Sequence, residues 1–197
     1  MKKVIALVIG VSLALGALAG TAAAAPKQST GGTQNVVEIA QSLKRFSTLV
    51  DLVVAADLAD TLAGDGTFTV FAPTNKAFNK LEKAVPGVTA ALLDPANKKV
   101  LQKVLLYHVL GSEVKSPAAA AAAKSKAKVS TLLGKGPNAK IQLRGKKNIN
   151  IRDSAKFNTA RVFKPFDVMA TNGVIHTINK VLVPKNVAKT LASAGLI

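Results

Sequence analysis

The spacing of the apolar residues changes along this chain, from a helical repeat in the first half to the alternation of strands in the second. Between Asn35 and Leu52, apolar residues recur three or four positions apart, which is typical of helices with one buried face. Short stretches rich in strand-forming residues follow after Val129: Ile141 to Leu143, Ile149 to Ile151, Arg161 to Phe163 and Val174 to Val183. A block of helices followed by a block of strands predicts an α+β fold, because an α/β fold would alternate the two.

Turn and cap residues place the boundaries of these elements. Gly-Asp-Gly at residues 64–66 indicates a turn after a second short helix over about residues 51–62, and residues 67–71 then alternate as a strand. Pro-Thr-Asn at residues 73–75 ends this strand, and its Thr or Asn can cap the next helix. Asp-Pro at residues 94–95 predicts a further helix start.

The first residues have the pattern of an export signal. Lys2 and Lys3 form a short positive region, residues 4–20 are apolar or small, and small residues continue up to Pro26. We expect a signal peptide over residues 1–24, cleaved after Ala24, and a product that is secreted, periplasmic or held at the cell surface. An uncleaved membrane anchor is the alternative, although the apolar stretch is short for a bilayer core of ~30 Å.

One domain is expected after the signal. Residues 25–34 are polar and contain glycine, which predicts a flexible N-terminal tether, and residues 35–184 form the domain, followed by a C-terminal tail over residues 185–197. Residues 116–128 contain six consecutive alanines and then lysines. Because these side chains offer little to bury, we expect an exposed, partly helical excursion.

Basic residues outnumber acidic ones and concentrate in the second half. Lys and Arg number 27 against 10 Asp and Glu, and from Val114 to Lys164 ten Lys and three Arg accompany one acid, Asp153. The residues that would form a polyanion-binding patch if the strands gather them are Lys124, Lys126, Lys128, Lys135, Lys140, Arg144, Lys146, Lys147 and Arg152. For an exported protein the predicted partners are envelope phosphates, acidic matrix polysaccharides and, through peripheral membrane contact, anionic headgroups.

Specific nucleic-acid recognition is not expected. Phosphates would bind such a patch, but one Tyr, seven Phe and no Trp leave few rings for base stacking. Export would also separate the protein from the nucleic acids inside the cell.

Several chemical classes are excluded or disfavoured by residue usage. The chain lacks Cys, which excludes disulfide-stapled domains, thiolate zinc sites, thiol nucleophiles and an N-terminal lipoprotein anchor. The two histidines, His108 and His176, have no metal-site spacing, no Gly-x-Ser-x-Gly elbow occurs, and residues 134–137 lack the phosphate-loop spacing. We therefore expect no enzyme, no catalytic residue and no metal. Both histidines are predicted to be buried, hydrogen-bonded structural groups, with a pH-sensitive contact as the alternative.

Four stretches in a fixed order carry a resemblance to a known family. Residues 67–75 read Thr-Phe-Thr-Val-Phe-Ala-Pro-Thr-Asn, residues 106–109 read Leu-Tyr-His-Val, residues 129–134 include Thr131-Leu132, and residues 172–184 begin Asn-Gly-Val-Ile-His. They resemble the first conserved box, the central Tyr-His motif, the Thr-Leu-x-Gly region and the second box of fasciclin domains. The resemblance extends over about residues 35–184.

The resemblance implies a single fasciclin domain, a β-wedge of about seven strands flanked by a cluster of helices. It also implies an extracellular or periplasmic role in adhesion or binding, without enzymatic chemistry. Residues around the Tyr-His motif and the second box are implicated in adhesion in the family. By position this implies the candidate contacts Leu106, Tyr107, His108, Val109, Asn172 and Ile175. Asn179 departs from the family pattern, which commonly has Asp there.

Two functions of different class follow. The first is a secreted cell-adhesion or binding module that attaches through its basic half to anionic surface or matrix polymers or to cell-surface proteins. The second is a water-soluble carrier of a lipophilic ligand such as a carotenoid, since the chain resembles in size and charge some basic, secreted fasciclin-domain proteins of photosynthetic microbes that bind carotenoids. A groove for a polyene needs apolar walls, and its candidate liners are Leu106, Val109, Ile175 and Ile178. No other cofactor is expected.

Overall fold

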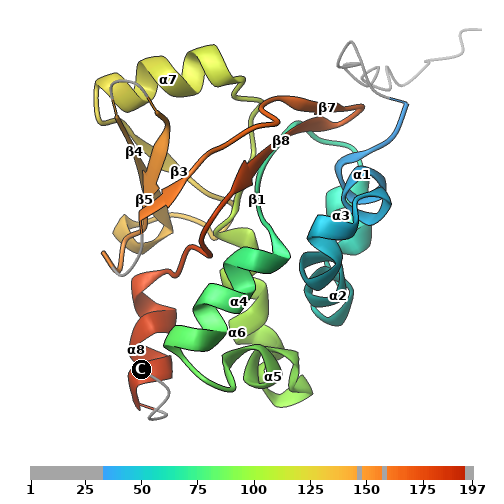
Figure 1. Ribbon diagram of the computed structural model, residues 1–197, viewed down its shortest axis with the longest axis vertical. Coiled ribbons are helices and arrows are strands. Elements are labelled where there is room, and N and C mark those ends of the chain that lie inside the picture. Colours follow the sequence, from blue (N-terminus) through green and yellow to red (C-terminus); the bar gives the residue numbers. More distant parts are fainter. Residues whose placement is uncertain (1–32, 146–147, 157–158, 194–197) are drawn as a thin grey trace, which may run out of the picture.

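The computed structural model of the chain describes residues 33–145, 148–156 and 159–193 (Figure 1). The predicted signal peptide over residues 1–24, most of the predicted tether, and Lys146 and Lys147 lie outside the described residues. The described part combines helices with two four-stranded sheets and has the predicted α+β class. Its strands number eight, where about seven were expected.

The N-terminal helices are shorter than the apolar spacing predicts. They comprise α1 (Val36–Ser42), η1 (Lys44–Phe46), α2 (Ser47–Ala55) and α3 (Ala59–Ala63). Leu43 has an extended backbone that ends α1, and Asp57 has a positive φ of 53° that separates α2 from α3. The helix predicted over residues 51–62 is therefore interrupted at Asp57. The sequence did not indicate this break, because the apolar side chains keep their helical spacing across it.

The first sheet has strand order β2-β1-β8-β7. Its strands are β1 (Phe68–Pro73), β2 (Val109–Leu110), β7 (Val168–Ala170) and β8 (Gly173–Ile178). The central pair, β1 and β8, is parallel, and the outer pairs are antiparallel. A side chain at Gly173 would place its Cβ 2.1 Å from the carbonyl oxygen of Phe68, so only glycine permits this close pairing.

A second helical group follows β1. It comprises α4 (Asn75–Ala84), α5 (Val88–Leu93), η2 (Pro95–Asn97) and α6 (Lys98–Leu106). Asp94 caps η2 by accepting from the Ala96 N–H, as predicted. Thr74 is the N-cap residue of α4, as one of the two predicted candidates, but its side chain makes no capping bond. The Asn75 amide instead bonds Lys44, Ser47 and Thr48 and ties α4 to the N-terminal helices.

The second sheet is antiparallel and has strand order β3-β4-β5-β6. Its elements, with the short helix before β4, are β3 (Lys128–Ser130), η3 (Pro137–Ala139), β4 (Lys140–Arg144), β5 (Asn150–Arg152) and β6 (Thr159–Arg161). A single bridge between Val162 and Ile178 joins it to the first sheet.

The alanine-rich segment is not an exposed excursion. It forms α7 (Ser116–Lys124), which packs against β4 and buries Ala119 and Ala123. The segment has little to bury, as expected, but the prediction that it is an unpacked excursion is wrong, since small alanine side chains let a helix approach a sheet closely. Its partly helical character is confirmed.

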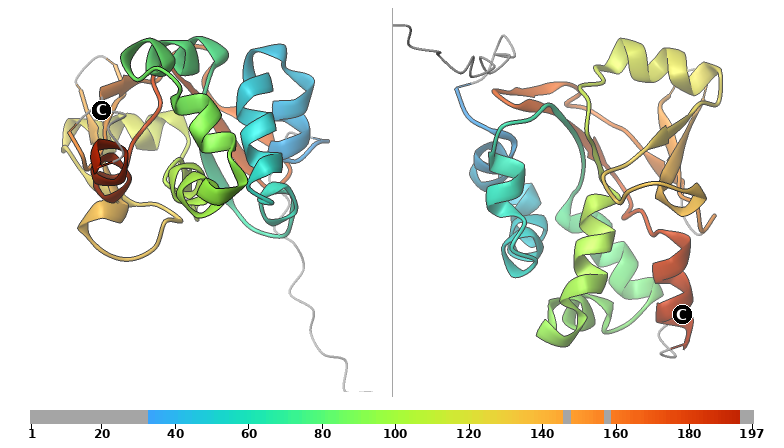
Figure 2. Two further views of the ribbon diagram at one scale, coloured as in Figure 1. Left: turned by 90° about the horizontal axis from the view of Figure 1, so that it is seen from below. Right: turned by 180° about the vertical axis from the view of Figure 1, so that it is seen from behind.

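Two apolar clusters form the core. One lies among α1–α6, α8 and the first sheet, and the other joins α7 to the inner face of the second sheet. Figures 1 and 2 show α7 and α5 at opposite ends of the molecule. The segment predicted as a tail after residue 184 contains α8 (Lys185–Ser193), which buries Val187. Among the described residues, no helix has the length and apolar character needed to cross a bilayer.

Candidate functional site

The Tyr-His motif lies inside the molecule. Tyr107 and His108 follow α6 and are 0% and 3% exposed, Val109 begins β2 and is buried, and Leu106 at the end of α6 is half-buried. These four candidate contacts therefore present little surface to a partner.

Tyr107 links the start of β4 to the segment that follows β5. Its hydroxyl donates to the Lys140 carbonyl at 2.9 Å and accepts from the Ser154 N–H at 2.7 Å. Burial raises the pKa of Tyr107, so the phenol is protonated at neutral pH and keeps its donor.

His108 uses both ring nitrogens on backbone groups. Its Nδ1 lies 2.8 Å from the Val104 carbonyl oxygen, and its Nε2 accepts from the Leu182 N–H at 2.9 Å. The proton is therefore on Nδ1. Burial lowers the pKa of His108 to about 4, which keeps the ring neutral at physiological pH. The prediction of a buried, hydrogen-bonded histidine is confirmed here.

His176 is also buried and bonded, as predicted. Its Nε2 lies 2.8 Å from the Val114 carbonyl oxygen, and its Nδ1 lies 3.8 Å from the Asp167 carboxylate. Ser116 lies close by, but its hydroxyl donates to Asp167. A hydrolase needs the serine hydroxyl on the histidine, so these three residues do not form a nucleophile–base pair. Within the described residues, no three His, Asp or Glu side chains cluster as metal ligands would.

The second-box candidates have intramolecular roles. Asn172 accepts from the Val36 N–H and donates to the carbonyls of Leu62 and Gly64, so it fastens the β7–β8 turn to α1 and α3. Ile175 and Ile178 are 1% and 0% exposed. They lie in different core clusters, Ile175 in the first and Ile178 in the second.

The strand register gathers basic residues on one face of the second sheet. Between β3 and β4, Lys128 pairs with Gln142 and Ser130 with Lys140. Between β4 and β5, Gln142 pairs with Arg152 and Arg144 with Asn150. Between β5 and β6, Asn150 pairs with Arg161. The intervening residues Val129, Ile141, Leu143, Ile151 and Ala160 belong to the second core cluster. Since side chains alternate across a sheet, the opposite face carries Lys128, Lys140, Arg144, Arg152 and Arg161, which we call the basic face.

The sequence predicted part of this basic face. Arg161 was missed, although its place two residues after Thr159 in a short strand could have indicated it. Lys124 ends α7, Lys126 lies in the following turn, and Lys135 lies in the loop before η3, so these three are exposed beside the strands and not on them.

One end of the basic face is hollowed into an open groove of about 670 Å³. The basic residues that line it are Lys128, Lys140, Arg152, Lys156 and Lys185. Asp153 is the acid in its lining, and it is 3% exposed, with its carboxylate accepting from the Val183 N–H at 3.4 Å. Lys156 and Lys185 were not predicted as site residues, because they lie outside the strands and only the fold brings them to the groove.

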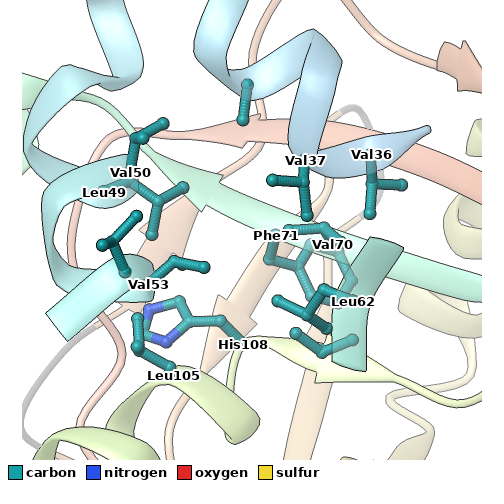
Figure 3. A pocket seen from close by; sticks show the side chains of 13 residues that line it. Val36, Val37, Leu49, Val50, Val53, Leu62, Val70, Phe71, Leu105 and His108 are labelled. Carbon is teal, nitrogen blue, oxygen red and sulfur yellow. The ribbon is translucent and has the colours of Figure 1, made fainter. Parts of the chain in front are cut away.

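A second hollow is apolar and narrow. It lies between the N-terminal helices and β1, has a volume of about 40 Å³, and is lined by side chains that include Val37, Leu49, Val53, Val70 and Leu105 (Figure 3). His108 and Val109 also line it, whereas Leu106, Ile175 and Ile178 do not.

Comparison with known proteins identifies the architecture. The family model described as fasciclin domain matches residues 44–184. The chain belongs to the fasciclin-domain family.

Relatives of this fasciclin domain occur in bacteria and animals. "Protein sll1483" of Synechocystis is 39% identical over 156 residues, which are 79% of this chain and 77% of the relative. The transforming growth factor-beta-induced protein ig-h3 of Sus scrofa is 36% identical over 153 residues, 76% of this chain but 19% of the relative. A solved fasciclin domain pair from the insect cell adhesion molecule Fasciclin I matches with a TM-score of 0.67 and 18% identity, over 79% of this chain and 53% of that one.

Three of the four stretches that resemble the family's motifs lie in or next to the first sheet. The first box is β1, the Tyr-His motif connects α6 to β2, and the second box contains β8. Asn179, where the family commonly has Asp, accepts from the Arg161 N–H at 2.8 Å and connects the two sheets. An amide oxygen is sufficient for this bond, so the lost charge does not open the junction.

Proposed function

We propose that this fasciclin domain is an exported binding module that attaches to anionic polymers of cell surfaces or matrix through its basic face. The observation that carries the proposal is the strand register, which aligns Lys128, Lys140, Arg144, Arg152 and Arg161 on one side of the second sheet. The name of the related Fasciclin I as a cell adhesion molecule supports a role of this class.

The distribution of acids supports the same direction of binding. Apart from Glu113, Asp153 and Asp167, every acid of the chain precedes Pro95 and belongs to the helical half. The positive charge of lysines in the helical half is therefore partly balanced by acids in the same part of the chain. The charge of the basic face is nearly all positive. A uniform face attracts polyanions and releases their counterions on binding.

The experiment compares two variants with equal loss of charge. One replaces Lys128, Lys140, Arg144, Arg152 and Arg161 by Gln, and the control replaces the exposed helical residues Lys76, Lys80, Lys83, Lys99 and Lys103 by Gln. On a sulfated-polysaccharide column, wild type and control should elute at high salt and the basic-face variant near the void. Equal weakening of both variants would contradict the proposal, as would a wild type that is not retained at low salt.

A second candidate function is transport of a lipophilic ligand such as a carotenoid. It is favoured by the almost entirely apolar lining of the hollow between α1, α2 and β1 (Figure 3). At about 40 Å³ the hollow has room for only a few water molecules, so a polyene requires α1 and α2 to separate from β1. A visible absorbance band of protein from its own source, with a matching polyene in the organic extract, would support it. A colourless protein with a lipid-free extract would contradict it.

A further inference from the structure

The groove at the end of the basic face is built from segments distant in the sequence. Its cations come from β3, β4 and β5, from the loop at Lys156, and from the first residue of α8, Lys185. A solubilising surface needs only exposed charges. Convergence of several elements on one hollow is instead typical of a binding site.

Ser154 fastens these segments to one another. Its hydroxyl donates to the Asn138 carbonyl at 3.1 Å and accepts from the Lys185 N–H at 3.1 Å, while its own N–H donates to the Tyr107 hydroxyl. Tyr107 in turn donates to the Lys140 carbonyl. The backbones that carry Lys140 and Lys185 are therefore held by one network, and the groove needs little ordering when a ligand binds.

The uncharged lining indicates the chemistry of the ligand. Asn138 and Gln142 supply side-chain amides beside the cations, which suits a chain that carries both anionic and hydroxyl groups. Among the described residues that line the groove, none is an aromatic residue on which a base could stack. The large exposed apolar residues of the described chain, Val54, Leu93 and Phe166, are not among its lining, so the described part of the groove offers no large exposed apolar side chain for insertion into a bilayer.

The backbones that carry two of the groove cations also lie well apart. Lys128 and Arg152 flank Gln142 on neighbouring strands, which places their backbones ~10 Å apart at ~4.8 Å per strand. This spacing exceeds the ~3.4 Å between charges along one DNA strand. A polymer with a charge on only some of its units fits it better.

We infer that this groove binds an acidic polysaccharide, a sugar chain that carries carboxylate or sulfate groups. The inference rests on the proposed function and deepens it, since it places the ligand in one part of the basic face. Lys140 and Arg152 bind the anionic groups, the amides of Asn138 and Gln142 bind sugar hydroxyls, and Ser154 acts as a positioning residue.

The test uses two pairs of variants of the full chain with the same loss of charge. Lys140→Gln with Arg152→Gln removes two groove cations, and Arg144→Gln with Arg161→Gln removes two from the basic face outside the groove. Calorimetry at fixed salt with a sulfated octasaccharide and with an oligogalacturonate separates sulfate from carboxylate recognition. We expect the groove pair to lose roughly tenfold or more in affinity, about 1.4 kcal/mol, and the outer pair roughly two- to threefold.

Equal losses of affinity by the two pairs, with wild-type binding intact, would overturn the assignment of the ligand to the groove. The proposed function would still stand. Absence of wild-type binding to any polyanion at low salt would overturn both. An oligodeoxythymidylate of equal charge that binds as tightly as the oligosaccharides would also overturn the assignment, because it would show that charge alone is recognised.

Ser154→Ala tests the positioning role without changing charge. We expect a lower affinity for the octasaccharide with an unchanged slope of affinity against salt, since the same cations still meet the ligand. Unchanged affinity, or a changed slope, would contradict this role.

Discussion

At the scale of single residues, Tyr107 and His108 direct their polar atoms to backbone groups of other segments. The Tyr107 hydroxyl reaches Lys140 and Ser154, and the His108 ring joins Val104 to Leu182. Neighbouring residues thus connect the helical half to two different parts of the strand-rich half. Each of these hydrogen bonds involves a buried polar group. Removing one partner leaves the other buried without a hydrogen bond, which lowers the stability of the fold.

The first prediction concerns Tyr107→Phe. The variant keeps the ring but leaves the Ser154 N–H and the Lys140 carbonyl without their phenolic partner. We expect a loss of about 1–3 kcal/mol in the free energy of unfolding, measured by urea titration, and faster hydrogen exchange of the Ser154 amide. Unchanged stability with unchanged exchange would show that water replaces the hydroxyl.

The second prediction concerns pH and His108. Because burial lowers its pKa from 6.5 to about 4, the unfolded chain binds the proton more readily than the folded one between these values. The contribution of His108 to the free energy of unfolding is fully present above pH 6.5 and decreases as the pH falls below that value. At ~1.4 kcal/mol per pH unit, the loss is about 3 kcal/mol once pH 4 is reached.

The variant His108→Gln isolates this effect. Glutamine keeps a donor and an acceptor but does not titrate, and every other titrating group is shared with wild type. The difference in unfolding free energy between wild type and variant should therefore shrink from pH 7 to pH 4.5. Parallel urea-derived stability curves would contradict the assignment.

The sequence predicted the burial of both histidines but not their partners. Their neighbours are apolar, which indicates an interior position, whereas Leu182 and Val114 reach the rings only through the fold. Lys156 and Lys185 escaped prediction for the same reason, since neither lies in an alternating strand. By contrast, Lys140, Arg144 and Arg152 directly flank the strands predicted over residues 141–143 and 149–151, so part of the basic face was predictable.

At the scale of elements, α7 shows how little side-chain volume a docked helix needs. Ala119 and Ala123 are 1% and 2% exposed and face the second sheet, while Ala118 and Ala121 face solvent. Side chains four apart lie on one helix face, so the alanine run presents a smooth surface to β4. Composition alone did not reveal this contact, because alanine carries a weak hydrophobic signal whether it is buried or exposed.

The third prediction compares Ala119→Leu with Ala121→Leu. Leucine and alanine both favour helix, so the two variants differ mainly in packing. Ala119→Leu should cost about 1–3 kcal/mol by overpacking the contact, whereas Ala121→Leu should stay within about 0.5 kcal/mol. Thermal and urea unfolding measure both, and equal effects would show that α7 is not docked on the sheet.

The helix boundaries were harder to predict than the strands. The strand pattern ends at turn residues, and the second sheet lies close to its predicted ranges. The apolar spacing in residues 35–62 continues through the breaks at Leu43 and Asp57, because each short helix keeps its apolar face on the same core. A helical period therefore indicated the buried face but not where the backbone turns.

At the scale of the whole molecule, the two kinds of charge are separated. Acids gather in the helical half and the basic face lies on the second sheet, toward the end that carries α7 (Figure 1). A molecule with this separation presents one side to a polyanion before any specific contact forms.

The fourth prediction is that this protein binds with a fixed orientation. Lys128, Lys140 and Lys185 should be protected from an amine-reactive label when the protein is held on a sulfated polysaccharide, because they line the groove. Lys80, Lys83 and Lys99 are exposed in the helical half and should label at the rate of the free protein. Mass spectrometry of the labelled peptides gives both sets, and uniform protection would contradict an oriented complex.

The parallel pairing of β1 with β8 also determines when the chain can fold. β1 ends at Pro73, and its central neighbour begins only at Gly173, so a ribosome must synthesise most of the polypeptide before the first sheet can close. Pairing between such distant segments forms slowly, because the long intervening loop must first be closed. If residues 1–24 act as the predicted signal, the nascent chain reaches the secretion channel before its central sheet exists, and it can be threaded through without first being unfolded.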